Sequence, residues 1–415
     1  MGVPARQPLP GVRPAVTLDD VLAARELLRG VARHTPVEES RALAQVVGGP
    51  AWLKCENLQR TGSFKIRGAY TRIARLSDTE RARGVVAASA GNHAQGVALA
   101  AQLTGCHATV FMPEGAPLPK VSATLSYGAE VRFAGATVDE AVLAATAWSA
   151  DTGGVLVHPF DHADVVAGQG TVGLEILEQC PDLRTVVVCT GGGGLVAGIA
   201  VAVKALRPDV RVVAAQAEGA AAWPGSLSAG RPVALARMRT MADGIAVGCP
   251  GEVPFGLVRD LVDDVVTVDD EALSRALLLL LERAKLVVEP AGAAAVAALL
   301  EGVPGLETPV VAVVSGGNID PLLLGRVIRH GLVAAGRYLA LRVTVPDSPG
   351  SLAALLETLA ATGANVGDVE HLRTGAGLHL DEVEVALQLE TRGPAHRELV
   401  LAALRDAGWP VRSAD

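Results

Sequence analysis

The stretch Thr185-Val186-Val187-Val188-Cys189-Thr190-Gly191-Gly192-Gly193-Gly194 joins a β-branched run to four consecutive glycines, and a helical stretch follows from Leu195 to Leu206. Glycines let backbone amides converge on an anion, and the N-terminus of the following helix adds the positive end of its dipole. A flexible glycine loop is the alternative, and a nucleotide-binding P-loop is disfavoured because the motif lacks the G-K-[ST] ending. The stretch therefore predicts a phosphate cradle at Gly191–Gly194 in an α/β fold.

A second loop, Ser89-Ala90-Gly91-Asn92-His93-Ala94-Gln95-Gly96, joins a predicted strand at 85–88 to a helix and offers a further anion site, suited to a carboxylate. The stretch Ser63-Phe64-Lys65-Ile66-Arg67-Gly68-Ala69 supplies a lysine. A lone lysine is usually a solvated surface charge, but a lysine amine also forms a Schiff base with an aldehyde cofactor. With a phosphate cradle and a carboxylate site in the same chain, Lys65 is predicted to hold pyridoxal phosphate.

From residue 85 to residue 331, short β-branched runs alternate with alanine-rich helical stretches, the pattern of a parallel sheet covered by helices on both faces. Ligands bind such sheets outside the carboxyl ends of the strands, where the glycine motifs at 89–96, 191–194 and 315–318 all fall. We expect two α/β lobes with the ligand between them, the smaller lobe spanning about 85–160. The predicted strands are 85–89, 108–112, 130–133, 155–158, 186–190, 210–217, 265–268 and 310–315, and the predicted helices include 92–103, 138–150, 165–179, 195–206 and 269–283.

A set of ordered motifs resembles the fold-type II pyridoxal-phosphate enzymes, and within them the threonine and serine dehydratases. The motifs are SFKIRGA at 63–69, SAGNHAQG at 89–96, GGGGL at 191–195, MADGIAVG at 241–248, EPAGAAAVAAL at 289–299 and SGGN at 315–318. Each motif alone is weak, but all of them occur in the family's order and spacing between about residues 18 and 331. The resemblance implies a two-lobed fold of the tryptophan synthase β type.

The pattern changes after Gly331. An alternating run at 339–345 is followed by the turn Pro346-Asp347-Ser348-Pro349-Gly350, a helix at 351–361, extended stretches at 365–372 and 380–389, and a helix at 395–407. This β-α-β-β-α order is similar to an ACT domain, a small α+β (ferredoxin-like) amino-acid-sensing module. A purely structural or dimerising cap is the alternative. The expected domains are a loose arm at 1–17, a catalytic domain at 18–335 and an ACT domain at 336–415.

The resemblance also implies roles for individual residues. Lys65 holds the cofactor and removes the substrate α-proton, Phe64 packs near the cofactor ring, and Asn92 hydrogen-bonds the ring hydroxyl. Ser315 places a neutral hydroxyl against the pyridine nitrogen, which gives a milder electron sink than a carboxylate would. The implied substrate-carboxylate site is Ser89, Ala90, Gly91, Asn92 and His93, the implied phosphate site is Gly191, Gly192, Gly193 and Gly194, and the implied effector site is Asp347, Ser348, Pro349, Gly350 and Asn365.

Two positions depart from related enzymes. Serine racemases of this fold carry a second serine where this chain has Ala90, so racemisation is disfavoured and elimination is left as the main outcome. Relatives with a divalent-cation site use acidic residues in the segment that here runs from Gln216 to Ala222, and this chain has glutamine first and no acid at the end. We therefore expect no bound metal ion.

Composition excludes several other classes. The formal net charge of −8 and an aromatic content of 3% argue against a protein that holds nucleic acid or an anionic membrane. The five cysteines are scattered without a C-x-x-C pair, and residues 1–14 are proline-rich without the apolar core of a signal peptide. Both features favour a cytoplasmic protein, and the resemblance implies a homodimer or homotetramer.

The resemblance implies a lyase that deaminates L-threonine to 2-oxobutanoate and ammonia, with activity on L-serine as well. The alternatives are a lyase with L-serine as its main substrate and a catalytically inert amino-acid-sensing protein. ACT domains occur in both biosynthetic and degradative lyases. A place in isoleucine biosynthesis with a branched-chain amino-acid effector is therefore one expectation, and threonine degradation stays open.

Overall fold

The computed structural model describes residues 15–373 and 378–413. These form two compact units that divide between Leu324 and Gly325. The division lies inside helix α14 (Pro321–Ala334), whereas the sequence placed the domain boundary after residue 335. Of the predicted arm at 1–17, residues 1–14 lie outside the described part of the chain.

The larger lobe of the first unit is built on a six-stranded sheet with the order β1-β2-β10-β7-β8-β9. Strands β2, β10, β7, β8 and β9 run parallel, and β1 pairs antiparallel to β2 at one edge. Every residue of β7 and β10 is buried, which explains their continuous apolar runs. The strands are β1 (Val37–Glu39), β2 (Ala51–Cys55), β7 (Thr185–Cys189), β8 (Arg211–Ala217), β9 (Asp264–Val268) and β10 (Val310–Val314).

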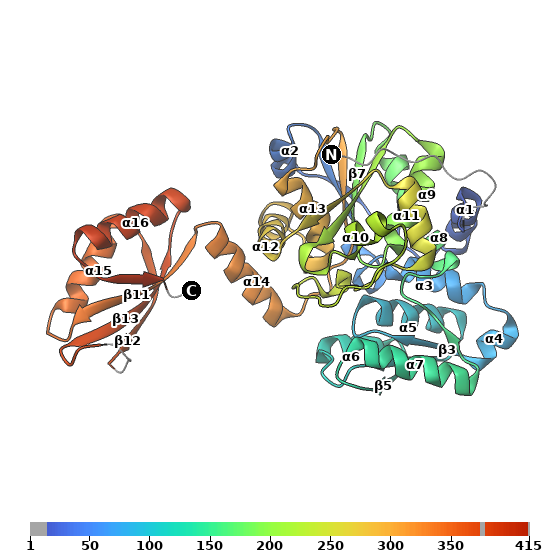
Figure 1. Ribbon diagram of the computed structural model, residues 1–415, viewed down its shortest axis with the longest axis horizontal. Helices are drawn as coiled ribbons and strands as arrows, with labels where there is room; N and C mark the ends of the chain where they lie inside the picture. The colour runs from blue at the N-terminus through green and yellow to red at the C-terminus, as the bar shows by residue number, and fades with distance from the viewer. Residues whose placement is uncertain (1–14, 374–377, 414–415) are drawn as a thin grey trace. The chain divides into compact units, whose positions relative to one another are not determined.

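Helices α8 and α9 pack against each other in this lobe, with α1 beside them (Figure 1). The helix predicted at 269–283 is present but is not α-helical throughout. Helix α12 ends at Leu279, and a π-helical turn continues to Ala284. The helices of the lobe are α1 (Leu18–Leu27), α2 (Arg41–Val47), α8 (Ala163–Gln179), α9 (Gly194–Leu206), α10 (Ala222–Ala229), α11 (Glu252–Leu261), α12 (Asp270–Leu279) and α13 (Pro290–Glu301).

The smaller lobe has a parallel sheet with the order β5-β4-β3-β6. Alternate residues of β3 enter different cores: Val85 and Ala87 pack with α5, and Val86 and Ala88 pack with α7. The core on the α5 side also takes in Ile66 from α3, before the predicted lobe. The elements are α3 (Lys65–Ala74), α4 (Asp78–Arg83), β3 (Val85–Ala88), α5 (Asn92–Thr104), β4 (Ala108–Met112), α6 (Leu118–Ser126), β5 (Glu130–Phe133), α7 (Val138–Thr152) and β6 (Val155–Leu156).

The C-terminal unit has the order β-α-β-β-α-β and a four-stranded antiparallel sheet arranged β12-β13-β11-β14. Residues of β11 and β13 are buried alternately, so one face of the sheet carries the core of Leu341, Val343, Val385 and their neighbours. The predicted ferredoxin-like order is therefore confirmed, with one further strand at the end. The elements are β11 (Tyr338–Pro346), α15 (Ser351–Thr362), β12 (Asn365–Leu372), β13 (Glu382–Glu390), α16 (Pro394–Asp406) and β14 (Val411–Ser413).

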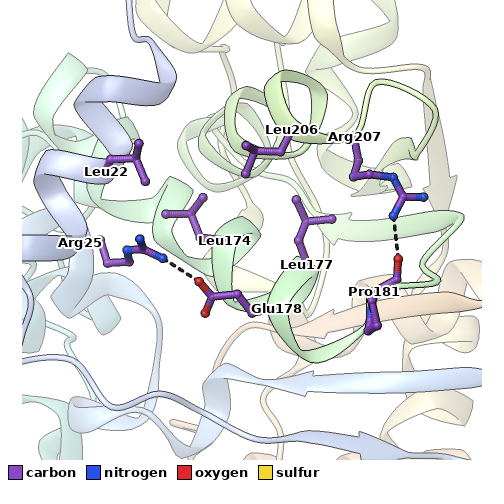
Figure 2. A pocket seen from close by; sticks show the side chains of 8 residues that line it. All are labelled: Leu22, Arg25, Leu174, Leu177, Glu178, Pro181, Leu206 and Arg207. Atoms are coloured by element: carbon purple, nitrogen blue, oxygen red, sulfur yellow. Dashed lines mark hydrogen bonds and ion pairs between the residues drawn. The ribbon is translucent and has the colours of Figure 1, made fainter.

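A surface groove of about 430 Å³ lies among α1, α8 and α9 (Figure 2). Its apolar lining comes from leucines, and the Arg25–Glu178 ion pair (2.6 Å) stands at one side. None of the predicted site residues lines it. The lining residues are Leu22, Arg25, Leu174, Leu177, Glu178, Pro181, Leu206 and Arg207. Within residues 15–373 and 378–413, no helix has the length and hydropathy that a bilayer-spanning helix requires.

A network of buried charges fixes helix α3 in the first unit. The guanidinium of Arg67 donates to both oxygens of Glu56 at 2.8 Å and to Glu175 at 2.6 and 3.0 Å. Lys54 Nζ donates to Glu175 at 2.6 Å, and the Thr35 hydroxyl donates to Glu56 at 2.5 Å. All five residues are buried. The network therefore joins β2, α3 and α8 beneath the N-terminus of α3.

Replacing Arg67 with methionine should destabilise the protein strongly, because it leaves the buried Glu56 without its cation and Glu175 with Lys54 alone. Breaking a buried pair in this way typically costs about 3–5 kcal/mol. Arg75→Ala is the matched control, since its ion pair with Asp164 at 2.6 Å is partly exposed and such pairs are worth about 1 kcal/mol or less. Thermal unfolding at one fixed scan rate measures both. Equal midpoints for the two variants would contradict the assigned importance of the network.

Candidate functional site

Lys65 is the first residue of α3, and its side chain is half-buried. Its Nζ donates to the carbonyl oxygen of Pro159 at 3.0 Å and lies 5.1 Å from the centroid of the Phe64 ring. Burial lowers the pKa of Lys65 to about 8, although the nearby Cys189 and Glu289 act in the opposite direction. The neutral form, which a nucleophile or base requires, is therefore easier to reach near neutral pH than at an ordinary lysine.

The four glycines follow β7 and lead into α9, as the sequence predicted. Gly193 has a φ of +100°, a conformation that side chains disfavour. A Cβ at Gly192 would lie 2.4 Å from Phe160 ring carbons, and one at Gly194 would lie 3.0 Å from the Phe160 Cβ. Trp223 Nε1 donates to the Gly191 carbonyl at 2.7 Å. The loop is thus closely packed from behind, and the first amides of α9 have no acceptor within their own helix.

Ser315 directly follows β10, and its side chain is buried. Its carbonyl accepts the Phe64 N–H at 3.2 Å, and Ser63 pairs with Gly316 in an isolated bridge. The end of β10 and the lysine segment are therefore attached to each other. Cys189, at the end of the neighbouring β7, remains a neutral thiol because burial raises its pKa to about 11.

Asn92 begins α5, after the end of β3. Its Nδ2 donates to Glu289 Oε1 at 2.5 Å, and its Oδ1 accepts from Asn318 Nδ2 at 2.7 Å. Burial, assisted by the carboxylate of Asp243, raises the pKa of Glu289 to about 7. Both ends of the Asn92 amide are therefore fixed by neighbouring side chains, so that its orientation is determined before any ligand arrives.

The other predicted residues of the loop at 89–96 fall into two groups. Ser89, Ala90 and Gly91 are half-buried, and Ser89 Oγ accepts the Gly91 N–H at 3.1 Å. His93 instead turns into the core, where its Nε2 lies 2.7 Å from the Val157 carbonyl. Burial lowers the pKa of His93 to about 3, so its ring is neutral and donates that hydrogen bond. The His93 side chain therefore packs in the core. Its contribution to a carboxylate site at the start of α5 is its backbone amide.

Sequence reasoning missed the turn from His158 to Asp161, which supplies the Lys65 acceptor and the aromatic cover of the glycine loop. The SGGN motif gives no role for Asn318, and nothing in the sequence connects Gln216 with the glycine loop. Gln216 Oε1 accepts the backbone N–H of Trp223 at 3.1 Å and so holds the start of α10, from which the indole reaches Gly191. The turn does follow strand β6 directly, so the rule that ligands bind at strand ends could have indicated it.

These residues fit pyridoxal phosphate. The glycine cradle leaves backbone amides at a helix N-terminus for a phosphate, and the partly neutral Lys65 amine suits an aldehyde. The Ser63 hydroxyl, two residues before Lys65, is buried without a hydrogen-bond partner among the described residues, as expected where a polar ligand belongs. The predicted cofactor-site residues thus come together at the carboxyl ends of β3, β7 and β10.

Residues 28–316 match the family model described as pyridoxal-phosphate dependent enzyme. The chain is 47% identical over 397 residues to an L-threonine ammonia-lyase of Thermotoga maritima, an alignment that covers 96% of this chain and 99% of the relative. It is 42% identical over 310 residues to a catabolic L-threonine dehydratase of Escherichia coli strain K12, covering 74% of this chain and 94% of the relative.

Two solved structures agree with these matches. A threonine deaminase from T.th. has a TM-score of 0.70 and 43% identity, covering 73% of this chain and 99% of its own. Maize serine racemase has a TM-score of 0.72 and 38% identity, covering 75% and 96%. The chain therefore belongs to the pyridoxal-phosphate-dependent enzyme family. Within that family it groups with the threonine ammonia-lyases, so the fold class, the cofactor and the family expected from the sequence are confirmed.

Acylation of Lys65 in the cofactor-free protein should reach half its maximal rate near pH 8, because only the neutral amine reacts and the pKa of Lys65 is about 8. At pH 7 roughly one-tenth of the amine is neutral. Trace labelling followed by peptide mass spectrometry measures this, with the exposed Lys285 as the reference amine in the same digest. A Lys65 profile that coincides with that of Lys285 would contradict the effect of burial.

Gly192→Ala should weaken binding of pyridoxal phosphate by about fivefold or more, because its methyl group overlaps the Phe160 ring and overpacking typically costs about 1–3 kcal/mol. Gly225→Ala is the matched control, since a Cβ there meets nothing within 4 Å. Absorbance titration of cofactor-free protein gives the affinity. The double variant Gly192→Ala/Phe160→Ala should recover binding, and failure of both effects would show that the loop is not the phosphate site.

Proposed function

We propose that this chain is a threonine ammonia-lyase that converts L-threonine to 2-oxobutanoate and ammonia by β-elimination, and converts L-serine to pyruvate as a second reaction. The observation that carries the proposal is the position of Lys65, which is joined through Phe64 to Ser315 and through the Pro159–Phe160 segment to the glycine cradle. The similarity to threonine ammonia-lyases over nearly the whole chain supports the same substrate.

In this proposal backbone amides do most of the binding. The amides that open α9 would hold the cofactor phosphate, and Asn92, with its amide already fixed by Glu289 and Asn318, would bind the ring hydroxyl. The Ser315 hydroxyl would serve the ring nitrogen, and Phe64 would pack near the ring. Ser89 and the amides of residues 90–93 hold the substrate carboxylate at the start of α5. When bound, pyridoxal phosphate supplies the electron sink that acidifies the substrate α-carbon.

Lys65 Nζ takes the α-proton, which breaks the Cα–H bond and leaves its electron pair to form the new double bond. The β-hydroxyl departs with a proton as water. The released enamine tautomerises and takes up water to give 2-oxobutanoate and ammonia, so the net reaction consumes threonine alone. Racemisation requires a proton donor on the opposite face, where this chain has Ala90 instead of a serine.

Lys65→Ala should lose turnover of L-threonine by several orders of magnitude together with the visible absorbance of the lysine-bound cofactor, because both depend on the same amine. Coupled assay of 2-oxobutanoate and ammonia, with circular dichroism as the control for folding, measures the loss. Borohydride reduction of the wild-type protein should attach the cofactor to Lys65. Attachment to another lysine, or full activity of the variant, would refute the assignment.

We further propose that the C-terminal unit is an ACT domain that binds a branched-chain amino acid in a cytoplasmic homo-oligomer, a dimer or a tetramer. Gly350, with a φ of +96°, caps α15 directly after Asp347-Ser348-Pro349. Asp347 pairs with Arg373 at 3.2 Å beside this helix N-terminus, which favours an amino-acid carboxylate and so supports the effector role. Asn365, whose Nδ2 donates to Glu390 at 3.1 Å, lies at the other end of the sheet, because Glu390 pairs with Tyr338 whereas Glu382 pairs with Pro346. A branched-chain effector would be consistent with a place in isoleucine biosynthesis.

A chain that stops after Gly336 keeps α14 whole and should remain an active lyase without a response to isoleucine or valine. Allosteric coupling is typically about 1–3 kcal/mol, which corresponds to a roughly 5- to 150-fold shift in apparent substrate affinity. Steady-state kinetics of both forms with and without these amino acids measure the shift. If the full-length chain is indifferent to them and the shortened chain has the same kinetics, the unit is structural.

A further inference from the structure

The amine of Lys65 is held by a backbone carbonyl that belongs to a different segment of the first unit. Its Nζ donates to the Pro159 oxygen at 3.0 Å. Pro159 lies in the turn from His158 to Asp161, between β6 and α8. Whatever determines the direction of this carbonyl also determines where the Lys65 amine rests.

His158 determines the shape of that turn. Its Nδ1 accepts the backbone N–H of Asp161 at 2.8 Å and that of Phe160 at 3.3 Å, so the ring closes the turn around Pro159. The His158 ring also packs edge-on against the Phe160 ring, with centroids 4.6 Å apart. An Nδ1 that accepts must be unprotonated. Burial keeps it so by lowering the pKa of His158, with Lys65 and His162 acting in the same direction and Asp161 opposing them.

The turn is attached to the phosphate cradle as well as to the lysine. The Phe160 ring fills the space beside Gly192, and Asp161 Oδ1 accepts the Val253 N–H at 2.8 Å. Gly251, in the segment before α11, donates to the Gly192 carbonyl at 3.1 Å. Lys65 and the glycine loop are therefore both positioned by the same four residues.

We propose that His158, acting through the Pro159 carbonyl, is a positioning residue for the proton-transferring amine of Lys65. A neutral amine has two N–H bonds and one lone pair. Donation of one N–H to Pro159 restrains the nitrogen and leaves the lone pair free for the substrate proton. After proton transfer the same carbonyl accepts from the ammonium, and a hydrogen bond to the charged form favours it. The inference rests on the proposed role of Lys65 as the base.

Two substitutions separate this role from simple packing. His158→Leu removes the acceptor, whereas His158→Asn keeps a side-chain oxygen that accepts N–H groups from the following residues, as in Asx turns. His162→Leu is the matched control. His162 Nδ1 accepts the Asp164 N–H at 3.1 Å at the start of α8, so this variant also removes a histidine acceptor for a backbone N–H, but one outside the turn that holds Lys65.

In the holoenzyme, His158→Leu should lower kcat for L-threonine by about tenfold or more with less than about a threefold change in KM, because the interaction acts on the chemical step. His158→Asn should recover most of kcat, and His162→Leu should keep it. In the cofactor-free full-length chain, the midpoint of Lys65 acylation should move to lower pH by about half a unit or more in His158→Leu alone, because the ammonium loses an acceptor.

Wild-type kcat and an unchanged acylation profile in His158→Leu would overturn the inference. So would equal losses in all three variants, which indicate general destabilisation. The labelling experiment needs neither substrate nor turnover. If L-threonine is not a substrate, the proposed function fails, while the acylation profiles still decide whether His158 positions the amine.

Discussion

The buried guanidinium of Arg67 is the interaction on which the active centre depends. Burial alone would lower the pKa of Arg67, but Glu56 and Glu175 raise it above its ordinary value, so the cation is retained. Arg67 lies two residues after Lys65 on α3, and Glu175 lies on α8. Because two carboxylates and the Lys54 ammonium share one network, any rotation or shift of α3 would separate opposite charges inside the protein, where separation is costly. The backbone of the lysine is therefore fixed by charges that never contact the ligand.

The parallel sheets explain why the remaining groups meet the lysine. Strands β7 and β10 of the larger sheet end at the same edge, in the loops that carry the four glycines and Ser315. Strand β3 of the smaller sheet ends in the loop that carries Asn92, and hydrogen bonds to Glu289 and Asn318 join Asn92 to the larger lobe. Most binding groups at those ends are backbone amides, which require glycine or close packing and no particular side chain. Phe160 and Trp223 supply that packing behind Gly192 and Gly191. The site thus combines a rigid backbone surface with few chemically active side chains.

Much of this arrangement could be predicted, because buried parallel strands are continuous apolar runs and glycine loops are visible in the sequence. All eight predicted strands occur, with ends that differ by a few residues. Strand β2 was missed because Lys54 interrupts its apolar run, and β1 because it has three residues, two of them glutamates. That lysine is buried only because Glu175, more than a hundred positions away, neutralises it. The role of Arg67 and the turn at His158 were missed for the same reason, since each depends on partners that are distant in sequence.

These two unpredicted features act on opposite ends of the same side chain. The Arg67 network fixes the backbone from which Lys65 projects, and the Pro159 carbonyl restrains its amine. A lysine has four rotatable bonds, and ordering such a side chain costs up to about 2 kcal/mol of conformational entropy. Because the side chain is restrained at both ends, this entropy is lost when the protein folds and not when the substrate binds. The buried charges and the His158 turn therefore hold the Lys65 amine in place in the folded protein. The amine needs little rearrangement when it accepts the substrate proton.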